Sequence, residues 1–376
     1  MRMPVKDQPH VLMTADALGG VWQYSLDLGA GLVRRGLSVT IAILGPAPAP
    51  ARIAAAEAAT GCRIVATGLP LDWMATDPAE VREAGAALAR LAAHLRADLV
   101  HLHAPALALA DCPAPVVAVC HSCVATWWEA LESGPLPADL AWRRDLAAEG
   151  CARVDALLAP THAFAAATQR LYGLAERPVV VHNGRRTPTA VVQDTPPAPY
   201  VFTAGRLWDR AKNAAALDRV AARLDWPLRA AGPIDGPGAE HVRAPHLDGL
   251  GRLDDAGIAA HLAARPVFLS LARYEPFGLA VLEAAQAGCA LVLSDLASFR
   301  ELWDGAALFV SPDDADGAVA AIRSLAEDPA ERARRGAAAR ARAGRYGVEA
   351  MTGGVLATFR ACWAGASIRS LGGAAA

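Results

Sequence analysis

Two acidic side chains, Glu275 and Glu283, flank an expected helix N-terminus in the stretch 266–295. The apolar run before them predicts a buried strand, and the pattern after it predicts a helix that begins at Phe277 and Gly278. A helix N-terminus presents unpaired N–H groups and the positive end of the helix dipole, so it binds phosphate readily. Acids on both sides of a phosphate site suit a ligand rich in hydroxyls, with Glu275 at a sugar and Glu283 at a ribose. The stretch therefore has the outline of a nucleotide-sugar site.

Two adjacent glycines, Gly19 and Gly20, form a second candidate site. They follow an apolar strand expected at 10–14 and begin a helix expected to run to about Arg35. Strand, glycine turn and helix make one mononucleotide-binding unit, but without G-x-G-x-x-G the pattern does not indicate a dinucleotide site. Glycines let another molecule approach the backbone closely. The alternative is a tight turn between strand and helix, and the sequence does not choose between the two.

The chain has 376 residues, of which 54% are apolar and 20% are charged, and its net charge is −2. This length fits two domains of about 180 residues each, and the composition is that of a folded protein. A charge so close to zero gives no field that would gather nucleic acid. No apolar run approaches the roughly 18 residues of a membrane helix, and the N-terminus lacks the apolar segment of a signal peptide. We therefore expect a cytoplasmic protein, with peripheral contact to a membrane left open.

Apolar strands alternate with helical patterns along the chain. After the strand at 10–14, strands are expected at 37–44, 63–66, 98–102, 116–120, 156–159 and 178–181. Alternation resumes after a proline-rich segment at 187–199, with strands expected at 200–204, 227–231, 266–271, 290–294 and 307–310. Near-continuous apolar strands between helices predict parallel sheets covered on both faces, a doubly wound α/β arrangement. Two such sheets joined by a hinge predict a ligand cleft at the carboxyl ends of their strands.

These patterns divide the chain into a first Rossmann-like domain at 1–187, a linker at 188–199, a second Rossmann-like domain at 200–345, and a helical tail at 346–376 that can cross back to the first domain. The region from Asp328 to about Arg369 has a helical pattern and contains Arg332, Arg334, Arg335, Arg340, Arg342 and Arg345. Such a charge run is typical of a solvated helix face. Contact with a membrane surface or a partner is the alternative.

Several segments together resemble one known family. The segment 275–283, EPFGLAVLE, resembles the E-x7-E signature of the retaining glycosyltransferases of family 4, which have the GT-B fold. The family's G-R-L-x-x-x-K element has a counterpart in AGRLWDRAKN at 204–213, with one additional residue before the lysine. Its N-domain segments have counterparts, in order, in DLVHLHAP, VVAVCHS, LLAPTHAFAAATQRLYG and VVVHNG. Its C-domain end resembles SDLASFRELWDGAALFVSPDDADGAVAAI, which contains Glu301. The resemblance implies an acceptor domain and a donor domain that face each other across a cleft.

In the second domain, the resemblance implies a catalytic role for Arg206 and Lys212. They would stabilise the charge of a departing nucleoside diphosphate, and fixed cations there favour the transition state over the ground state. A surface pair at the beginning of a helix is the alternative.

The resemblance also assigns the region around the second strand–helix turn. The backbone N–H groups of Phe277, Gly278 and Leu279 would bind the donor phosphates. Glu275 would bind hydroxyls of the donor sugar and Glu283 the ribose. Glu283 lies among apolar residues, where an unpaired carboxylate would cost several kcal/mol, so it needs a partner. The alternative for Glu283 is a role in capping a neighbouring group.

In the first domain, the resemblance implies that His121 faces the donor sugar, and Gly19 and Gly20 are candidate donor-binding residues from their pattern. Many members have an aspartate after this histidine, whereas this chain has Ser122. A hydrogen-bonded core histidine is the alternative interpretation. Asn183 and Gly184, at the end of another strand, are expected to shape the cleft.

Three patterns resemble metal or redox sites without completing them. His101 and His103 share one side of a strand, but no third ligand is evident, so we expect packing or donor contact. The C-x-x-C at 120–123 has no second C-x-x-C, and seven cysteines without a signal peptide indicate reduced thiols. Asp314 and Asp316 form a D-x-D within a first helical turn, where capping and the helix dipole explain them.

We therefore predict a retaining glycosyltransferase that moves a sugar from a nucleoside-diphosphate sugar to an acceptor hydroxyl, with no cofactor and no metal expected. A nucleotide-sugar epimerase of the same fold and a catalytically silent GT-B binding or scaffold subunit are the alternatives. The base and sugar of the donor are open. The acceptor, a glycan, a lipid or a small molecule, depends on loops such as 127–137, whose Trp127 and Trp128 either stack on a sugar or pack.

Overall fold

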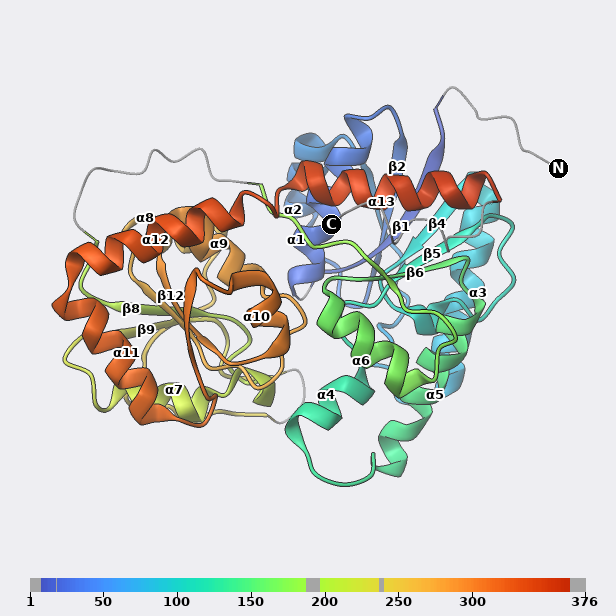
Figure 1. Ribbon diagram of the computed structural model, residues 1–376. Coiled ribbons are helices and arrows are strands. Elements are labelled where there is room, and N and C mark those ends of the chain that lie inside the picture. The colour runs from blue at the N-terminus through green and yellow to red at the C-terminus, as the bar shows by residue number, and fades with distance from the viewer. Residues whose placement is uncertain (1–7, 18, 187–196, 237–239, 366–376) are drawn as a thin grey trace. The chain divides into compact units, whose positions relative to one another are not determined.

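The computed structural model describes residues 8–17, 19–186, 197–236 and 240–365, and Figure 1 traces the chain. By its internal contacts the chain divides into two units. The first comprises Met1–Arg185 and Val348–Ala376, and the second comprises Arg186–Gly347. The chain thus builds most of one unit, completes the other, and returns to the first with its last helix.

The first unit contains a seven-stranded parallel sheet with the order β3-β2-β1-β4-β5-β6-β7. Its strands are β1 (His10–Asp16), β2 (Ser38–Leu44), β3 (Arg63–Ala66), β4 (Leu99–Leu102), β5 (Val116–Val119), β6 (Ala156–Ala159) and β7 (Val179–Val180). Its helices are α1 (Gly20–Val33), α2 (Pro50–Thr60), α3 (Pro78–Leu95), the 3-10 helix η1 (Pro105–Leu107), α4 (Val124–Leu131), α5 (Ala138–Arg153), α6 (His162–Tyr172) and α13 (Val348–Trp363).

The second unit contains a six-stranded parallel sheet with the order β10-β9-β8-β11-β12-β13. Its strands are β8 (Val201–Ala204), β9 (Leu228–Ala231), β10 (Asp248–Gly251), β11 (Val267–Ser270), β12 (Ala290–Ser294) and β13 (Ala307–Val310). Its helices are the 3-10 helix η2 (Arg210–Lys212), α7 (Ala214–Ala221), α8 (Asp255–Ala263), α9 (Leu279–Ala287), α10 (Ala297–Trp303), α11 (Ala315–Glu327) and α12 (Pro329–Ala343).

Each sheet has a separate hydrophobic core on each of its faces. In β1, Val11 and Met13 belong to one core cluster and Leu12 to another, because successive side chains of a strand point to opposite faces. In β11, Phe268 and Leu269 are divided between two clusters in the same way. Both faces of both sheets are therefore buried, and the predicted pair of doubly wound α/β sheets is confirmed.

In both units the strand order reverses next to the first strand. The reversal lies between β1 and β4 in the first unit and between β8 and β11 in the second. Doubly wound sheets bind ligands outside the carboxyl ends of the strands at such a point. In the second unit, Arg206 follows β8 and Glu275 follows β11, so the two residues lie on the two sides of this reversal.

Three details differ from the expectations. Strand β10 was not predicted, because DGLG is rich in glycine, is mostly exposed, and lacks the β-branched and aromatic residues that indicate a strand. The helical pattern expected from Asp328 to about Arg369 contains two helices, α12 and α13, because the chain leaves the helical conformation between Ala343 and Val348, where Gly344 and Gly347 lie. Arg332, expected on a solvated face, is only 5% exposed.

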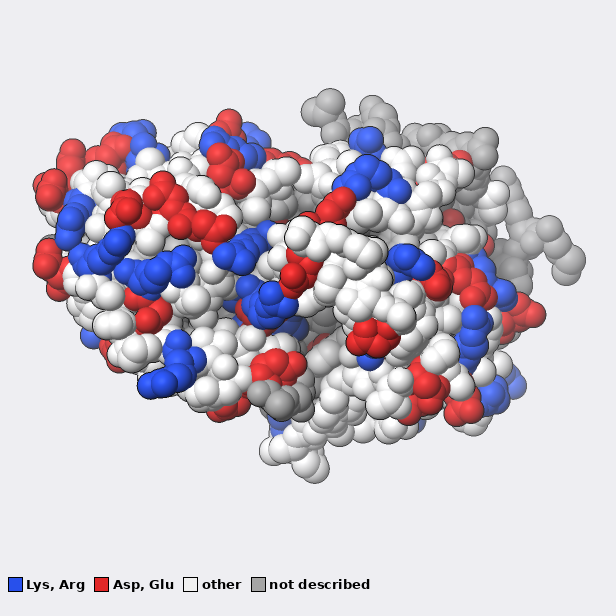
Figure 2. All heavy atoms as spheres, turned by 90° about the horizontal axis from the view of Figure 1, so that it is seen from below, with Lys and Arg blue, Asp and Glu red and all other residues white. Residues whose placement is uncertain are grey.

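Most of the predicted linker, 188–199, lies outside the described residues, so the four-part division remains a prediction there. No helix among the residues that the structure describes is long and apolar enough to cross a membrane. Basic and acidic side chains are interspersed over the face shown in Figure 2, as a net charge of −2 allows.

Candidate active site

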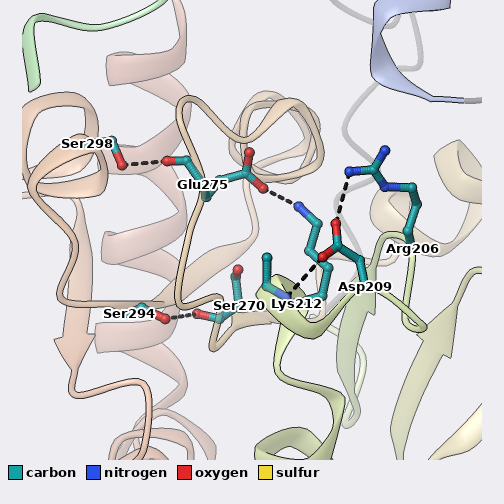
Figure 3. A network of polar contacts seen from close by, with 8 residues as sticks. Arg206, Asp209, Lys212, Ser270, Glu275, Ser294 and Ser298 are labelled. Carbon is teal, nitrogen blue, oxygen red and sulfur yellow. Dashed lines mark hydrogen bonds and ion pairs between the residues drawn. The ribbon is translucent and has the colours of Figure 1, made fainter. Parts of the chain in front are cut away.

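The second unit brings Lys212 and Glu275 together from two different loops. Lys212 ends η2 after β8, and Glu275 lies in the loop between β11 and α9. The Nζ atom of Lys212 donates to Oε2 of Glu275 (Figure 3), and the side chains are 24% and 18% exposed. The two residues are 63 positions apart in the sequence, and the pairing of β8 with β11 brings them together. The structure thus joins the predicted cation and the predicted sugar-binding acid in one partly buried ion pair.

Arg206 lies beside this pair and is held by an acid that the sequence analysis did not single out. Its Nη2 donates to Oδ2 of Asp209 at 2.9 Å, and its guanidinium lies 5.5 Å from the ring centroid of Trp208. Asp209 also accepts, through Oδ1, from the backbone N–H of Ala211 at 3.0 Å (Figure 3). Asp209 therefore fixes both Arg206 and the turn that carries Lys212.

Glu275 is fixed through its backbone as well as its carboxylate. The Oγ of Ser298, on α10, donates to the carbonyl oxygen of Glu275 at 2.6 Å (Figure 3). On the other side of the reversal, Asn213 donates through Nδ2 to the carbonyl oxygens of Leu271 and Pro312. Side chains from two segments thus hold the loop after β11: Ser298 ties it to α10, and Asn213 ties it to the loop after β8.

The N-terminus of α9 lies directly beside Glu275. Gly278 precedes the helix with φ of 88°, in the left-handed region that favours glycine. A Cβ at Gly278 would lie 3.0 Å from Cε1 of Phe299, 3.2 Å from Cγ2 of Val281 and 3.4 Å from Cγ of Glu275. Glycine is therefore required here by both the backbone and the available space.

The first N–H groups of α9 are not capped by a side chain of the described residues. By contrast, α8, α11 and α12 in the same unit each have an aspartate that accepts at the N-terminus, and these are Asp254, Asp314 and Asp328. An uncapped N-terminus leaves donors and a positive dipole end available to an anion. Helices α7 and α10 also begin without a cap from any described side chain, but α9 begins directly after Glu275. Its N-terminus is therefore the one that lies beside the predicted sugar-binding acid.

The remaining predicted donor residues lie on or next to α9. The Phe277 ring is buried and packs edge-on against Tyr346 at 5.9 Å, so only its backbone can contact a ligand. Leu279 begins the helix and Glu283 lies one turn further along, and both are partly buried. Glu301, on α10, is also partly buried.

In the first unit, His121 lies in a group of aromatic rings at the ends of β4 and β5. Its ring contacts Tyr24 of α1 at a centroid distance of 4.5 Å and His103 at 5.1 Å, both edge-on. His101 contacts His103 at 5.1 Å. His103 is also hydrogen-bonded to Ser25, with 3.2 Å between Nδ1 and Oγ. The structure therefore gathers the three predicted histidines into one cluster.

These histidines are neutral at physiological pH. Burial, followed by the neighbouring His121, lowers the pKa of His101 to about 3, and burial lowers the pKa of His121 to about 4. Burial also lowers the pKa of His103 well below its usual value. Both ring nitrogens of His101 and the Nε2 atoms of His103 and His121 are buried without a hydrogen-bond partner among the described residues. A neutral His121 can donate or accept a hydrogen bond to a sugar hydroxyl.

Gly19 and Gly20 begin α1 after β1. Gly19 has φ of −148°, a conformation open to any residue, and no side chain among the described residues caps the helix. The backbone conformation of Gly19 therefore does not explain a glycine there, and both the turn interpretation and the ligand interpretation remain predictions.

The structure also shows the surroundings of the D-x-D at 314–316 and the C-x-x-C at 120–123. Asp314 caps α11 by accepting from the N–H of Gly317 at 2.8 Å, so its predicted capping role is confirmed. Cys120 and Cys123 are free thiols. Burial raises the pKa of Cys123, but hydrogen bonds with Cys120 and Thr126 outweigh it and lower the pKa to about 6. No group of three His, Cys, Asp or Glu side chains is placed to hold a metal within the described part of the chain.

Sequence reasoning missed three residues that organise these sites. Asp209 could have been found, because an aspartate three residues before Lys212 is a typical cap for a short helical turn. Ser298 and Tyr24 carry no comparable local signal. Their roles come from contacts over 23 and 97 sequence positions, with Glu275 and His121 respectively.

The second sheet carries cations, an acid and an uncapped helix end at its reversal, and these groups suit a phosphorylated, hydroxyl-rich ligand. Two family models match the chain: Glycosyltransferase Family 4 over residues 18–187 and Glycosyl transferases group 1 over residues 199–342. Together they cover most of the chain. The chain belongs to this family of GT-B glycosyltransferases, as the resemblance predicted.

Individual relatives agree with this placement. A glycogen synthase from Mycobacterium tuberculosis is 41% identical over 95 residues, which are 25% of this chain and 23% of that protein. The chain spans about a quarter of the length of the curated relatives that it matches.

Two solved structures share the fold. Sucrose-phosphate synthase from Thermosynechococcus elongatus has a TM-score of 0.78 at 18% identity, covering 96% of this chain and 100% of that one. Anabaena HepE in complex with UDP-glucose has a TM-score of 0.72 at 19% identity, covering 94% of this chain and 99% of that one. The likeness confirms the GT-B fold.

Proposed function

We propose that this protein is a glycosyltransferase that moves a sugar from a nucleoside-diphosphate sugar to an acceptor hydroxyl with retention of anomeric configuration. The observation that carries the proposal is the Lys212–Glu275 ion pair beside the uncapped N-terminus of α9. Lys212 supplies a cation, the Glu275 carboxylate can accept hydrogen bonds from hydroxyl groups, and the first turn of α9 offers uncapped N–H groups. All three lie at the strand-order reversal of the second sheet. A nucleotide sugar requires this combination.

Each group has a distinct role in the proposed reaction. The N–H groups at the beginning of α9 hold the diphosphate. Arg206 and Lys212 stabilise the negative charge that grows on the diphosphate as the glycosidic bond breaks. Asp209 holds the Arg206 guanidinium in place, so little reorganisation is needed at that moment. Glu283 is assigned to the ribose on its position along α9.

The ion pair also favours a binding role for Glu275. Its carboxylate accepts from Lys212, so it is paired with a cation and suited to accept from sugar hydroxyls. Retention would then come from attack on the same face as the departing diphosphate, which needs no covalent intermediate on a carboxylate pair of the hydrolase type. His121 is assigned to a donor-sugar hydroxyl as a neutral hydrogen-bonding group.

The donor nucleotide is proposed to be UDP. Anabaena HepE, which shares the fold, was solved with UDP-glucose. The acceptor is not assigned, because the relatives include proteins named for glycogen synthesis and for phosphatidyl-myo-inositol mannosyl transfer.

A thermal-shift screen with UDP, GDP, ADP and their sugars tests the donor site. A cognate nucleotide at 100 times its dissociation constant should stabilise the protein by about 2.7 kcal/mol. With the cognate donor identified, Glu275→Gln and Lys212→Ala should each lower sugar transfer about 100-fold or more. Glu327→Gln, an equal change at an exposed position, should leave the rate unchanged.

The same experiment separates the alternatives. An epimerase would convert the donor without any acceptor, and a silent scaffold would neither bind a nucleoside diphosphate nor turn over a sugar nucleotide. Near-normal transfer in both Glu275→Gln and Lys212→Ala would show that the site is assigned wrongly.

A further inference from the structure

The second unit contains a basic pocket at the other end of α9. The pocket has a volume of about 210 Å³ and is lined by Arg265, Arg332 and Arg340, together with small residues that include Ala287, Gly288 and Gly336. These lining residues include three guanidinium groups and no acid. The other side chains are small, so the guanidinium groups dominate the chemistry of the pocket.

The floor of the pocket is built where α12 crosses the end of α9. A Cβ at Gly336 would lie 2.2 Å from the carbonyl oxygen of Gly288. Glycine at 336 therefore allows the two backbones to approach closely. Neither glycine projects a side chain into the space between the arginines.

Arg332 is buried, and no carboxylate among the described residues forms a hydrogen bond or ion pair with its guanidinium. Its side chain is 5% exposed, and its Nη2 donates to the carbonyl oxygens of Ala198 at 2.6 Å and Arg265 at 2.9 Å. Its guanidinium lies over the ring of Trp226 at 5.0 Å. Its Nε is buried with no hydrogen-bond partner among the described residues. A buried charge without a counter-charge is costly, so Arg332 is an incompletely satisfied cation in the wall of the pocket.

We propose that the pocket formed by Arg265, Arg332 and Arg340 binds the phosphate group of a small phosphate monoester. A phosphate dianion supplies the missing counter-charge and accepts several charge-assisted hydrogen bonds at once, and guanidinium groups match its oxygens in pairs. The C-terminal end of α9 carries the equivalent of about half a negative charge. The three positive charges of Arg265, Arg332 and Arg340 exceed this half negative charge, so the pocket is positive overall.

This pocket is separate from the proposed donor site. Helix α9 has nine residues, so its two ends are about 13 Å apart at 1.5 Å per residue. The donor phosphates are assigned to the beginning of α9, whereas Ala287 and Gly288, at its end, line the basic pocket. The inference therefore does not depend on the proposed transferase activity.

Titration of the full chain with inorganic phosphate and with methyl phosphate, followed by ³¹P NMR at constant ionic strength, tests the proposal. Arg340 is exposed, so Arg340→Ala should keep the fold, and we expect it to weaken phosphate binding about tenfold. Arg345→Ala removes the same charge from an exposed position outside the pocket and should change the affinity less than twofold. Arg340→Lys should recover part of the binding.

A second variant distinguishes this pocket from the donor site. The phosphate binding that depends on Arg340 should persist in Lys212→Ala, because Lys212 does not line the pocket. Loss of binding in Lys212→Ala with none in Arg340→Ala would place the phosphate at the donor site and overturn the proposal. Equal affinities in Arg340→Ala and the unaltered protein, or no saturable binding at all, would overturn it as well.

Discussion

Gly278 illustrates how one residue serves both the fold and the site. Its φ of 88° places the backbone in the left-handed region, and this turn directs the chain from Glu275 into α9. The neighbouring Phe299 and Val281 leave little room for a side chain. The position of the free N–H groups relative to Glu275 therefore depends on the absence of one carbon atom.

Replacement of Gly278 by alanine should destabilise the protein and weaken nucleotide binding. A left-handed conformation costs a non-glycine residue about 1–2 kcal/mol, and the 3.0 Å approach to Phe299 adds a steric term. We expect a larger loss in the free energy of unfolding than in Gly305→Ala. Gly305 has a similar φ of 77°, but a Cβ there would meet nothing within 4 Å. Urea unfolding and UDP titration measure the two effects.

The comparison with Gly305 distinguishes the cost of the left-handed backbone from the cost of steric crowding around Gly278. Gly305→Ala should show the backbone cost alone and should leave UDP affinity unchanged. If the two variants lose the same stability and both retain UDP binding, then the crowding around Gly278 is not important for the site.

At the scale of elements, the histidine cluster joins four parts of the first unit. His101 is on β4, His103 and His121 follow β4 and β5, and Tyr24 and Phe359 contact the cluster from α1 and α13. Burial holds the three imidazoles neutral in the folded chain. In the unfolded chain they regain a pKa near 6.5.

This difference predicts a loss of stability in mild acid. Above about pH 6.5 the histidines are neutral in both states, so they contribute no pH dependence. As the pH falls below 6.5, the unfolded chain binds protons that the folded chain does not, and the free energy of unfolding decreases until the folded pKa values are reached. For His101, with a folded pKa of about 3, the loss at pH 5 is about 2 kcal/mol. Urea unfolding at pH 7 and pH 5 measures it.

Asp72 acts in the opposite direction in the same pH range. Burial raises its pKa to about 6, so protonation of Asp72 favours the folded state as the pH falls. One carboxyl group opposes three imidazoles, and the net effect remains a loss of stability. His101→Phe should reduce the pH dependence by about 2 kcal/mol, whereas His94→Gln, at an exposed position, should not. Identical pH dependence in both variants would refute this explanation.

For the whole molecule, the C-terminal helix completes the first unit. Phe359 on α13 is fully buried and belongs to the same core cluster as Val11 and Met13 of β1. Trp363 donates through Nε1 to the carbonyl oxygen of Asp98 at 2.8 Å. The first unit is therefore incomplete until the last part of the chain has been made.

Truncation of one side chain tests this dependence. Phe359→Ala should lower the free energy of unfolding by about 3–5 kcal/mol, because it removes a buried aromatic ring and leaves a cavity. Arg360→Ala, on the exposed side of the same helix, should have little effect. Hydrogen exchange should increase in the strands of the first unit. A uniform increase that extends equally through β8 to β13 would contradict the division into two units.

Much of the fold could be predicted from the sequence because it depends on local patterns. Apolar runs placed twelve of the thirteen strands in the described part of the chain, and β10, with two glycines and no β-branched residue, was missed. The glycine before α9, the aspartate that caps α11 and the glycine after α9 are signals within a few residues. Local signals also led to Glu275, Arg206 and Lys212 as candidates.

The tertiary structure alone decided which residues act together. The Lys212–Glu275 pair, the support of Glu275 by Ser298 and the cluster around His121 arise from sheet pairing between segments far apart in the chain. The burial of Arg332 could not be predicted from the sequence either, because its carbonyl partners are 67 and 134 positions away in the chain. The sequence by itself thus determined the elements and their candidate chemistry, because both follow from neighbouring residues. The tertiary structure decided partnership, burial and the basic pocket, because these depend on long-range packing.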